Sequence, residues 1–196
     1  MLDLEKIDIK SMTLEELKDD LESIEIQKFR SAQVFKWLHK GAESFDEMTD
    51  LSKGLRESLS DRYEIAWAKI VLKRVSKDGT IKYLFRMNDG ELVEAVLMEY
   101  RHGYSICIST QVGCKMNCSF CATGQSGFAR DLTASEMLSE VQSAQKDSGV
   151  RISNIVLMGM GEPLDNYYNV LRFLELISCP EGMNIGMRHI SLSTCG

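Results

Sequence analysis

Hydrophobic positions in the first sixty residues recur every three or four places, the spacing of an amphipathic helix. The first predicted helix follows a capping box made by Thr13 and Glu16. Its apolar face comprises Leu14, Leu17, Leu21 and Ile24. A second helix contains an apolar cluster at residues 34–38 and ends at Gly41, and a third is predicted over residues 51–59. This segment is interpreted either as a small helical bundle used for packing or as an appendage that binds a partner.

Between residues 65 and 100 the hydrophobic period changes from that of a helix to the two-residue period of a strand. The alternating apolar positions include Ile81, Tyr83, Phe85 and Met87. The segments 78–79 (Asp-Gly) and 88–90 (Asn-Asp-Gly) have the composition of hairpin turns. We therefore expect a three-stranded antiparallel meander that ends near Tyr100.

From Tyr104 onward, predicted strands alternate with predicted helices. The strands are expected at residues 104–109, 152–158 and 187–193, and the helices at residues 134–149 and 167–177. The first of these helices follows a second capping box, Thr133 with Glu136, and ends at Gly149. Alternation of this kind is typical of parallel β-α units.

The predicted fold is therefore α/β, in three parts. We expect a helical N-terminal domain at residues 1–62, an antiparallel β-meander linking region at residues 63–101 and a parallel region at residues 102–196. About two and a half β-α units fit into the last part, whereas a complete barrel takes about 250 residues. The sequence therefore predicts the first part of a barrel-type domain, with the chain ending inside it.

Composition adds little to this picture but excludes several classes of protein. The chain has 196 residues, of which 44% are hydrophobic and 27% charged, as in an ordinary globular protein. It contains no apolar run long enough to cross a membrane and begins without a secretory signal, so a cytoplasmic protein is expected. The formal net charge of −6 gives no argument for nucleic-acid binding, although a local basic patch would suffice.

The cysteines are the first indication of chemistry. Cys114, Cys118 and Cys121 form a C-x3-C-x2-C loop directly after a predicted strand. Three thiolates on one loop suit three corners of a cubic iron–sulfur cluster and leave the fourth iron open to a substrate. Zinc is the alternative, with His102 or Cys107 as a fourth ligand.

This loop resembles the signature of the radical S-adenosylmethionine (SAM) superfamily, in which an aromatic residue, here Phe120, precedes the third cysteine. The surrounding motifs, in the order of the chain, resemble those of the RlmN type, the radical SAM RNA methyltransferases that act on C2 of adenosine. These motifs are residues 93–96 (Val-Glu-Ala-Val), 107–114 (Cys-Ile-Ser-Thr-Gln-Val-Gly-Cys), 159–163 (Gly-Met-Gly-Glu-Pro) and 192–194 (Leu-Ser-Thr). The resemblance runs from the helix of Trp37 to Gly196 and implies the first part of a (βα)6-type partial barrel.

The resemblance also implies the cofactors and the residues that hold them. Cys114, Cys118 and Cys121 match the ligands of a [4Fe-4S] cluster, whose open iron is chelated by SAM. Gly161 and Glu162 match the segment that holds the methionine end of SAM, where glycine permits close approach and a carboxylate suits an ammonium. Ser193 matches a further SAM contact. Taken alone, a glycine turn after a strand and a serine at a strand end are common features.

Two more residues match catalytic positions of the family. Glu94 matches the proton acceptor; by the two-residue period it shares a strand face with Leu92, Val96 and Met98, and its pKa is expected to be raised if it is buried. Without the family, an exposed strand glutamate is the simpler interpretation. Cys107, otherwise a small core residue, matches the cysteine that forms a transient disulfide with a C-terminal, methyl-carrying cysteine.

In the mechanism that the resemblance implies, one SAM methylates that C-terminal cysteine and a second is cleaved reductively to a radical. The radical activates the methyl group for addition to the adenine ring. Glu94 then takes a proton, and Cys107 helps to release the RNA. Cys195 does not match the methyl-carrying residue, which is expected beyond this chain, so the fragment alone is expected to be inactive.

The resemblance names the partners as well. The expected substrates are 23S rRNA near the peptidyl-transferase centre and the adenosine beside a tRNA anticodon. A flavodoxin or ferredoxin is the expected electron donor; a full-length monomer and no membrane partner are expected, and the N-terminal helices would present RNA. The nearest competing interpretation is the C8-methylating, Cfr-like type, against which Pro163 argues. A glycyl-radical activase and a non-catalytic iron–sulfur or zinc remnant compete with it more distantly.

Overall fold

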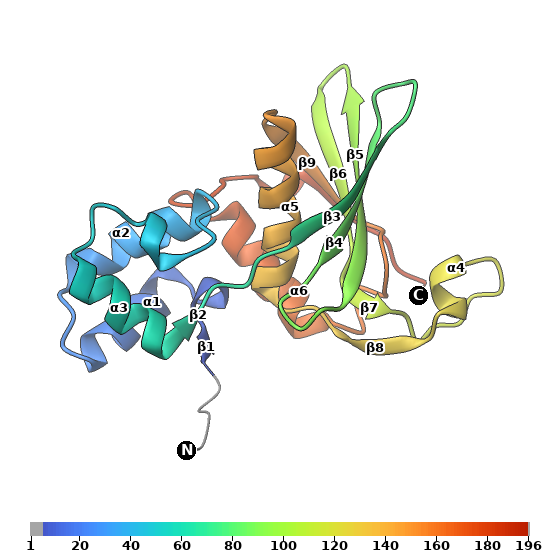
Figure 1. Ribbon diagram of the computed structural model, residues 1–196. Helices are drawn as coiled ribbons and strands as arrows, with labels where there is room; N and C mark the ends of the chain where they lie inside the picture. Colours follow the sequence, from blue (N-terminus) through green and yellow to red (C-terminus); the bar gives the residue numbers. More distant parts are fainter. Residues whose placement is uncertain (1–5, 196) are drawn as a thin grey trace.

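The computed structural model describes residues 6–195; residues 1–5 and Gly196, the outer ends of the predicted domains, lie outside the described part. A helical unit formed by residues 9–62 lies beside a mixed β-sheet, and two helices from the second half of the chain occupy the space between them (Figure 1). The cysteine loop and the end of the chain lie at one edge of the sheet, away from the helical unit. This arrangement agrees with the predicted α/β fold class.

The helices and strands have the following bounds. The α-helices are α1 (Leu14–Ser23), α2 (Lys28–His39), α3 (Lys53–Arg62), α4 (Ala122–Gln125), α5 (Ala134–Ser148) and α6 (Tyr167–Ser178). The strands are β1 (Ile7–Asp8), β2 (Tyr63–Glu64), β3 (Lys69–Val75), β4 (Ile81–Arg86), β5 (Leu92–Tyr100), β6 (Gly103–Ile108), β7 (Gln111–Gly113), β8 (Phe128–Asp131), β9 (Ile152–Leu157) and β10 (Ile190–Leu192). Short 3-10 turns span Ile9–Ser11, Phe45–Glu47 and Met187–His189.

One six-stranded sheet, in the order β10-β9-β6-β5-β4-β3, contains both the predicted meander and the predicted parallel strands. The strands β3 to β6 pair antiparallel, as the two-residue period and hairpin turns predict. The strands β6, β9 and β10 pair parallel, which confirms the β-α units. Because β5 also pairs with β6, the meander is a direct continuation of the parallel sheet. The sheet is open.

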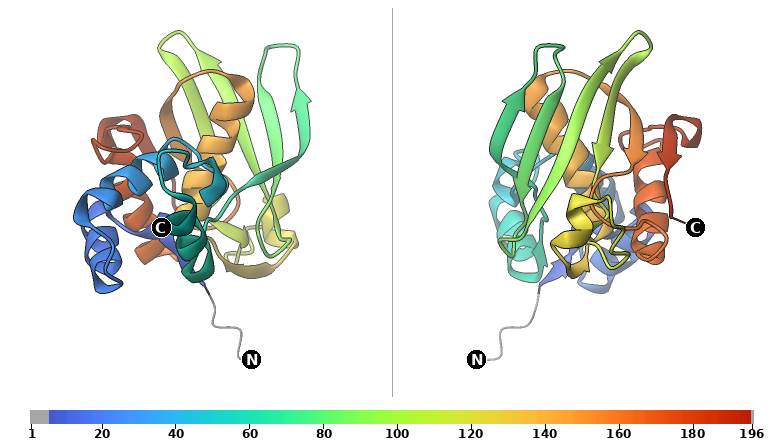
Figure 2. Two further views of the ribbon diagram at one scale, coloured as in Figure 1. Left: turned by 60° about the vertical axis from the view of Figure 1, so that its left-hand side comes forward. Right: turned by 90° about the vertical axis from the view of Figure 1, so that its right-hand side faces the viewer.

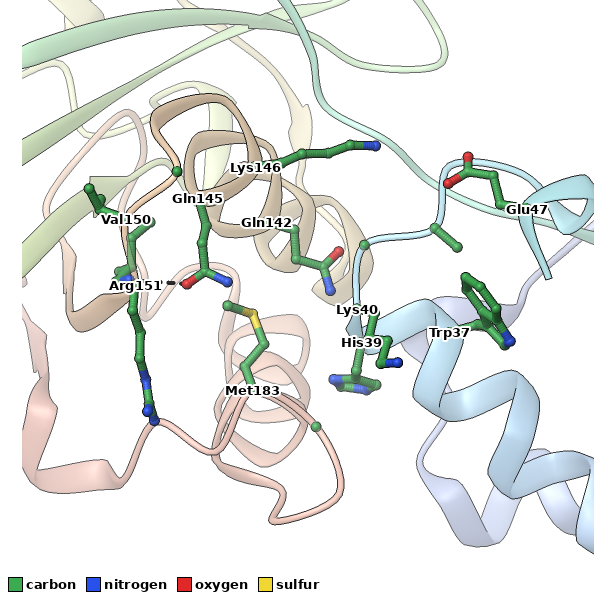
Figure 3. A pocket seen from close by; sticks show the side chains of 15 residues that line it. Trp37, His39, Lys40, Glu47, Gln142, Gln145, Lys146, Val150, Arg151 and Met183 are labelled. Carbon is green, nitrogen blue, oxygen red and sulfur yellow. Dashed lines mark hydrogen bonds between the residues drawn. The ribbon is translucent and has the colours of Figure 1, made fainter. Parts of the chain in front are cut away.

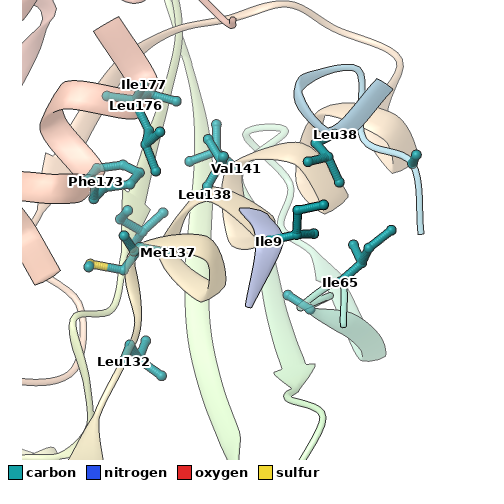
Figure 4. Close-up of a cluster of buried hydrophobic side chains, with 14 of the residues drawn as sticks. Ile9, Leu38, Ile65, Leu132, Met137, Leu138, Val141, Phe173, Leu176 and Ile177 are labelled. Atoms are coloured by element: carbon teal, nitrogen blue, oxygen red, sulfur yellow. The ribbon is translucent and has the colours of Figure 1, made fainter. Parts of the chain in front are cut away.

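The core lies on the sheet face that α5 and α6 cover. On β5 this face carries Val93, Ala95 and Leu97, all nearly inaccessible to solvent. Helix α5 is buried along most of its length. Its apolar side chains lie between those of α6 and those of the helical unit, and the labelled examples are Met137, Leu138, Val141, Phe173, Leu176, Ile9 and Leu38 (Figure 4). Alternate burial along β5 therefore decides which side chains remain on the other face.

The predicted helix boundaries are confirmed where capping residues fix them. Both capping boxes form, Thr13 with Glu16 and Thr133 with Glu136. Gly149 ends α5 with a left-handed backbone (φ 70°), which glycine adopts without strain.

The predicted strand at residues 187–193 is wrong in its first half. Residues 187–189 form a 3-10 turn closed by a bond from the His189 amide to the Gly186 carbonyl oxygen (2.8 Å). Because that donor is used locally, the strand begins only at Ile190. None of the helices formed by residues 6–195 is long and apolar enough to cross a bilayer.

Candidate functional site

The cysteine loop extends from a small antiparallel hairpin, β7–β8, that the hydrophobic pattern does not predict. Cys114 follows β7, and its amide donates to the Gly127 carbonyl oxygen (2.8 Å). Gly113 closes the hairpin with φ +78°, and a Cβ atom there would lie 1.9 Å from the same oxygen. Only glycine permits so close an approach of the backbone at residue 113 to the Gly127 carbonyl oxygen. The two ends of the cysteine loop are therefore held together by the hairpin.

All six cysteines are free thiols, and the three of the loop are partly buried. Cys121 caps the short helix α4, and hydrogen bonds from the Gly124 and then the Thr123 amides lower the pKa of its thiol. No group of three potential metal ligands is already clustered in the part of the chain that the structure describes. The donor set itself, three free soft thiols within eight residues, fits an iron–sulfur cluster.

His102 is not positioned to complete a zinc site. It lies just before β6, whereas the cysteine loop follows the opposite end of that strand. Its ring stacks on Tyr100, with 5.4 Å between the ring centroids. Burial raises the pKa of the Cys107 thiol, with a further contribution from the nearby Glu140 carboxyl, although a backbone hydrogen bond at Met158 opposes this.

The turn that contains Gly161 and Glu162 follows β9 and packs directly against β6 and β7. The Gly159 amide donates to the Ile108 carbonyl oxygen (3.0 Å), and a Cβ atom at Gly159 would lie 2.5 Å from that oxygen. Gly161 has φ +100°, and a Cβ atom there would lie 2.6 Å from the Cβ of Gln111. Both glycines are therefore required by close packing as well as by the turn.

Glu162 joins this turn to the segment after β10. The side chain is buried, and its carboxylate accepts hydrogen bonds from the amides of Cys195 (2.9 Å) and Leu164 (3.0 Å). Burial disfavours the carboxylate, but these bonds, with smaller ones from the Thr194 and Cys195 side chains, outweigh it and lower the pKa of Glu162. The two segments predicted to contact SAM are thus hydrogen-bonded to each other.

Ser193 lies at the same end of the sheet. Its amide donates to the Leu157 carbonyl oxygen (3.2 Å), which extends the parallel pairing by one residue beyond β10. Cys195, to which the sequence assigns no role, is exposed. A hydrogen bond from its thiol to the Glu162 carboxylate, followed by slight desolvation and the negative charge of Glu162, raises the pKa of Cys195.

Glu94 and Cys107 lie on the same sheet face, opposite to α5. Val96 is the register partner of Cys107, and Glu94 is two residues before it on β5, so the two side chains are diagonal neighbours. The face shared with Leu92, Val96 and Met98 is confirmed, because Val93, Ala95 and Leu97 are the buried positions.

The condition that Glu94 is buried is not met. Its side chain is 46% exposed and forms an ion pair with Lys82 (2.7 Å) on the neighbouring strand. The reason lies in the sheet: within residues 6–195, α5 and α6 cover the other face, so this face remains open (Figure 2, right). Burial is therefore no basis for a role of Glu94.

Three buried polar residues that join these segments are absent from the predicted site. The Ser109 hydroxyl donates to the Glu94 carbonyl oxygen (2.7 Å) and accepts from the Met160 amide (3.0 Å). The Glu140 carboxyl accepts from the Ser109 amide (3.2 Å), and burial raises its pKa well above the usual range. Gln111 is the third. For Glu140 the sequence did contain a signal: it is a charged residue at an inward position of a predicted helix, among Met137, Val141 and Ala144.

A cavity of about 680 Å³ lies elsewhere, between α2, α5 and the loop after α6. Trp37, His39, Gln142, Arg151 and Met183 are among its lining residues (Figure 3). It opens near the start of β9, whereas the Gly161 turn follows the end of that strand. None of the predicted site residues lines it.

Comparisons with known proteins match two regions of the chain to known families. Residues 7–65 match the family described as the ribosomal RNA large subunit methyltransferase N-terminal domain, and residues 108–196 match the radical SAM superfamily. The chain is 54% identical over 194 residues to a probable dual-specificity RNA methyltransferase RlmN of Lachnoclostridium phytofermentans, covering 98% of this chain and 54% of that protein. For the protein of the same name from Alkaliphilus metalliredigens the identity is 52%, covering 98% and 55%.

A solved structure is similar as well. The crystal structure of a radical SAM methyltransferase from Sphaerobacter thermophilus superposes with a TM-score of 0.88 at 40% identity, covering 97% of this chain and 57% of that one. The chain spans about half the length of the curated relatives that it matches. The matched regions, their order and the overlap in structure show that residues 108–196 are a radical SAM segment and that residues 7–65 are an N-terminal domain of the kind found in the ribosomal RNA large subunit methyltransferase family, in the arrangement of the relatives named RlmN.

Proposed function

We propose that this chain is the cluster- and SAM-binding part of an enzyme that methylates C2 of adenosine in 23S rRNA and in tRNA. One observation carries the proposal: the cysteine loop, the Gly161–Glu162 turn and the Ser193 segment meet at the carboxyl ends of β6, β9 and β10. Ligands of open parallel sheets bind at this edge. The names of the relatives, dual-specificity RNA methyltransferases, support the substrate class.

In this proposal Cys114, Cys118 and Cys121 bind the [4Fe-4S] cluster, which supplies, when bound, the electron for reductive cleavage of SAM. Gly161, which packs on Gln111, would place the backbone of this turn beside the methionine end of SAM. The Glu162 carboxylate, already ionised and held by two backbone amides, is oriented to pair with the ammonium group. Ser193 supplies a further polar contact at the tip of β10.

Glu94 and Cys107 act on the open face of the sheet. Lys82 pairs with the ionised form of Glu94, the form that accepts a proton from the methylated adenine ring. Cys107 is one diagonal step away. We propose that its thiolate attacks the sulfur of the methyl-carrying cysteine in the protein–RNA adduct, so that the S–S bond forms as the C–S bond to the RNA breaks and the electron pair of that bond stays with the methylated adenine. The second cysteine of that disulfide has no counterpart in this chain.

Pro163, directly after Glu162, favours C2 over C8 methylation by its resemblance to the C2-acting type. An electron donor such as flavodoxin or ferredoxin completes the proposed system. On its own, the 196-residue chain is proposed to bind a cluster without methylating RNA, because no residue of it matches the methyl-carrying cysteine.

Two measurements test the proposal. After anaerobic reconstitution we expect iron and sulfide in equal amounts and a change in the electron paramagnetic resonance (EPR) spectrum of the reduced cluster on addition of SAM. Bound zinc without sulfide contradicts it. Mass spectrometry of RNA from cells that express the protein with its remaining part should give C2-methyladenosine; methylation at C8 favours the Cfr-like type. Methylation of RNA by the purified chain contradicts the proposed inactivity of the fragment.

A further inference from the structure

Gln111 is a buried side chain to which the proposed function assigns no role. It opens β7, three residues before Cys114, and is inaccessible to solvent. Its amide nitrogen donates to Asp131 (2.8 Å) and to Asp165 (3.0 Å), and its amide oxygen accepts from the Glu162 amide (2.9 Å). Both N–H groups and the oxygen are therefore engaged, so the side chain has a single orientation.

These three contacts reach three different segments. Asp131 ends β8 and is the register partner of Gln111, so this bond holds the hairpin that supports the cysteine loop. Glu162 belongs to the turn proposed to hold the methionine end of SAM. Asp165 forms an ion pair with Lys115 (2.9 Å), the residue directly after the first cysteine.

The backbone reinforces the same arrangement. The Gln111 amide donates to the Met160 carbonyl oxygen (3.2 Å), and Gly161 packs so closely on the Gln111 side chain that no Cβ atom fits there. The turn, the hairpin and the cysteine loop thus meet at one amide group. A displacement of Gln111 would change the position of the Glu162 turn relative to the thiols.

The chemistry explains why an amide stands at this position. A glutamate would keep the acceptor for the Glu162 amide but would lose both donors and add a negative charge beside Asp131 and Asp165. An apolar residue would leave the Glu162 amide and two carboxylates without this partner, which is costly in a buried place. Among side chains of this length only glutamine satisfies all three neighbours.

We propose that Gln111 is a positioning residue that sets the distance between the cluster loop and the SAM-binding turn, and thereby the affinity for SAM. The inference rests on the proposed function, since it concerns the same cofactors. It predicts separate effects on the two cofactors: the thiols remain able to take up iron and sulfide, whereas SAM no longer meets the turn and the cluster together.

The test is Gln111→Glu in the full chain, reconstituted anaerobically with iron and sulfide. We expect unchanged iron and sulfide content and a SAM dissociation constant raised about ten- to hundredfold, the effect of losing a buried charge-assisted hydrogen bond. The SAM-dependent change in the EPR spectrum of the reduced cluster should need correspondingly more SAM. Gln145→Glu is the matched control, because Gln145 also accepts from a backbone amide, that of Ile152 (3.0 Å), at the other end of the sheet.

A second variant separates positioning from general destabilisation. When Gln111→Glu is combined with Asp131→Asn, the introduced asparagine can donate a hydrogen bond to the introduced carboxylate, which restores the bond with reversed polarity. We expect this double variant to recover most of the SAM affinity.

The outcomes are distinguishable. If the unsubstituted chain takes up no cluster or shows no response to SAM, the proposed function fails. If that chain binds both, but Gln111→Glu binds SAM equally well, loses its iron as well, or is not rescued by Asp131→Asn, the role of Gln111 is refuted.

Discussion

At the scale of the residue, each proposed functional side chain depends on a few neighbours that the structure identifies. Glu162 is held by two backbone amides and Glu94 by Lys82, and the amides of Gly124 and Thr123 lower the pKa of Cys121. Such contacts set the charge state and the direction of a side chain. A substitution that changes only its functional group is therefore expected to affect cofactor binding or proton transfer more than the stability of the fold.

Cys118→Ala is expected to abolish cluster uptake while leaving the fold nearly unchanged. The thiol lies on a partly exposed loop and forms no part of the core, so the substitution removes a ligand and little packing. Iron and sulfide analysis with a thermal melt checks this. Cys179→Ala, a half-buried thiol outside the loop, is the control and should retain the cluster. Full iron content in Cys118→Ala would mean that this thiol is not a ligand.

Glu94→Gln, in a protein that also carries the methyl-carrying cysteine, is expected to leave SAM cleavage largely intact and to block product release. The amide cannot accept the proton, so a covalent protein–RNA adduct should accumulate and be visible on a denaturing gel. Glu99→Gln, an exposed position near the end of the same strand, should behave like the unsubstituted protein. Normal turnover of Glu94→Gln would exclude Glu94 as the proton acceptor.

At the scale of the element, the strands that position the cysteine loop are short. The hairpin β7–β8 has strands of three and four residues, and its close turn depends on Gly113. The periodicity of hydrophobic residues predicts long elements such as α5 and β5 well, because each has a repeated buried face. It does not predict three-residue strands such as β7, because these are too short to show a repeated buried face and are held mainly by hydrogen bonds to distant parts of the chain.

Gly113→Ala is therefore expected to unfold the hairpin and to weaken cluster uptake. A Cβ atom would meet the Gly127 carbonyl oxygen at 1.9 Å in addition to the strain of a positive φ. Gly127→Ala has a similar φ of +77° but nothing within 4 Å of the new atom. Gly127→Ala should therefore cost about 1–2 kcal/mol, and Gly113→Ala at least about 3 kcal/mol, by denaturant unfolding. Equal costs would refute the argument from the close approach.

At the scale of the whole molecule, the helical unit is joined to the sheet unit through buried polar contacts as well as apolar ones. The Lys10 ammonium is fully buried, donates to the Ala66 carbonyl oxygen (3.2 Å) and to Ser139 of α5 (2.7 Å), and lies over the Trp67 ring. Burial lowers the pKa of Lys10 to about 7, although the carboxylates of Asp8 and Glu43 oppose this. The stability of the contact between the helical unit and the sheet unit is therefore expected to depend on pH.

The direction in which stability changes with pH follows from the pKa of Lys10 in the unfolded chain, 10.5, and in the folded chain, about 7. Between pH 7 and 10.5 the unfolded chain keeps the Lys10 proton and the folded chain has lost it, so the unfolded state binds more protons and stability rises with pH. Lys10→Met is expected to abolish this rise, worth at most a few kcal/mol. The measurement is the unfolding free energy at several pH values. The exposed Lys36→Met is the control, and a parallel pH dependence in Lys10→Met and the unsubstituted protein would refute the assignment.

The sequence by itself determined the order of the longer helices and strands, both capping boxes and the cysteine loop. It did so because hydrophobic period, capping and ligand spacing are local properties of the chain. It also indicated which face of β5 carries Glu94, since strand alternation fixes the face.

Only the tertiary structure decided whether that face is covered, that the meander continues into the parallel sheet, and that residues 187–189 turn before β10. It alone brought Gln111, Glu162 and Lys115 together from separate segments. Burial and hydrogen bonding between distant residues depend on how the elements pack, and no local pattern in the chain specifies them.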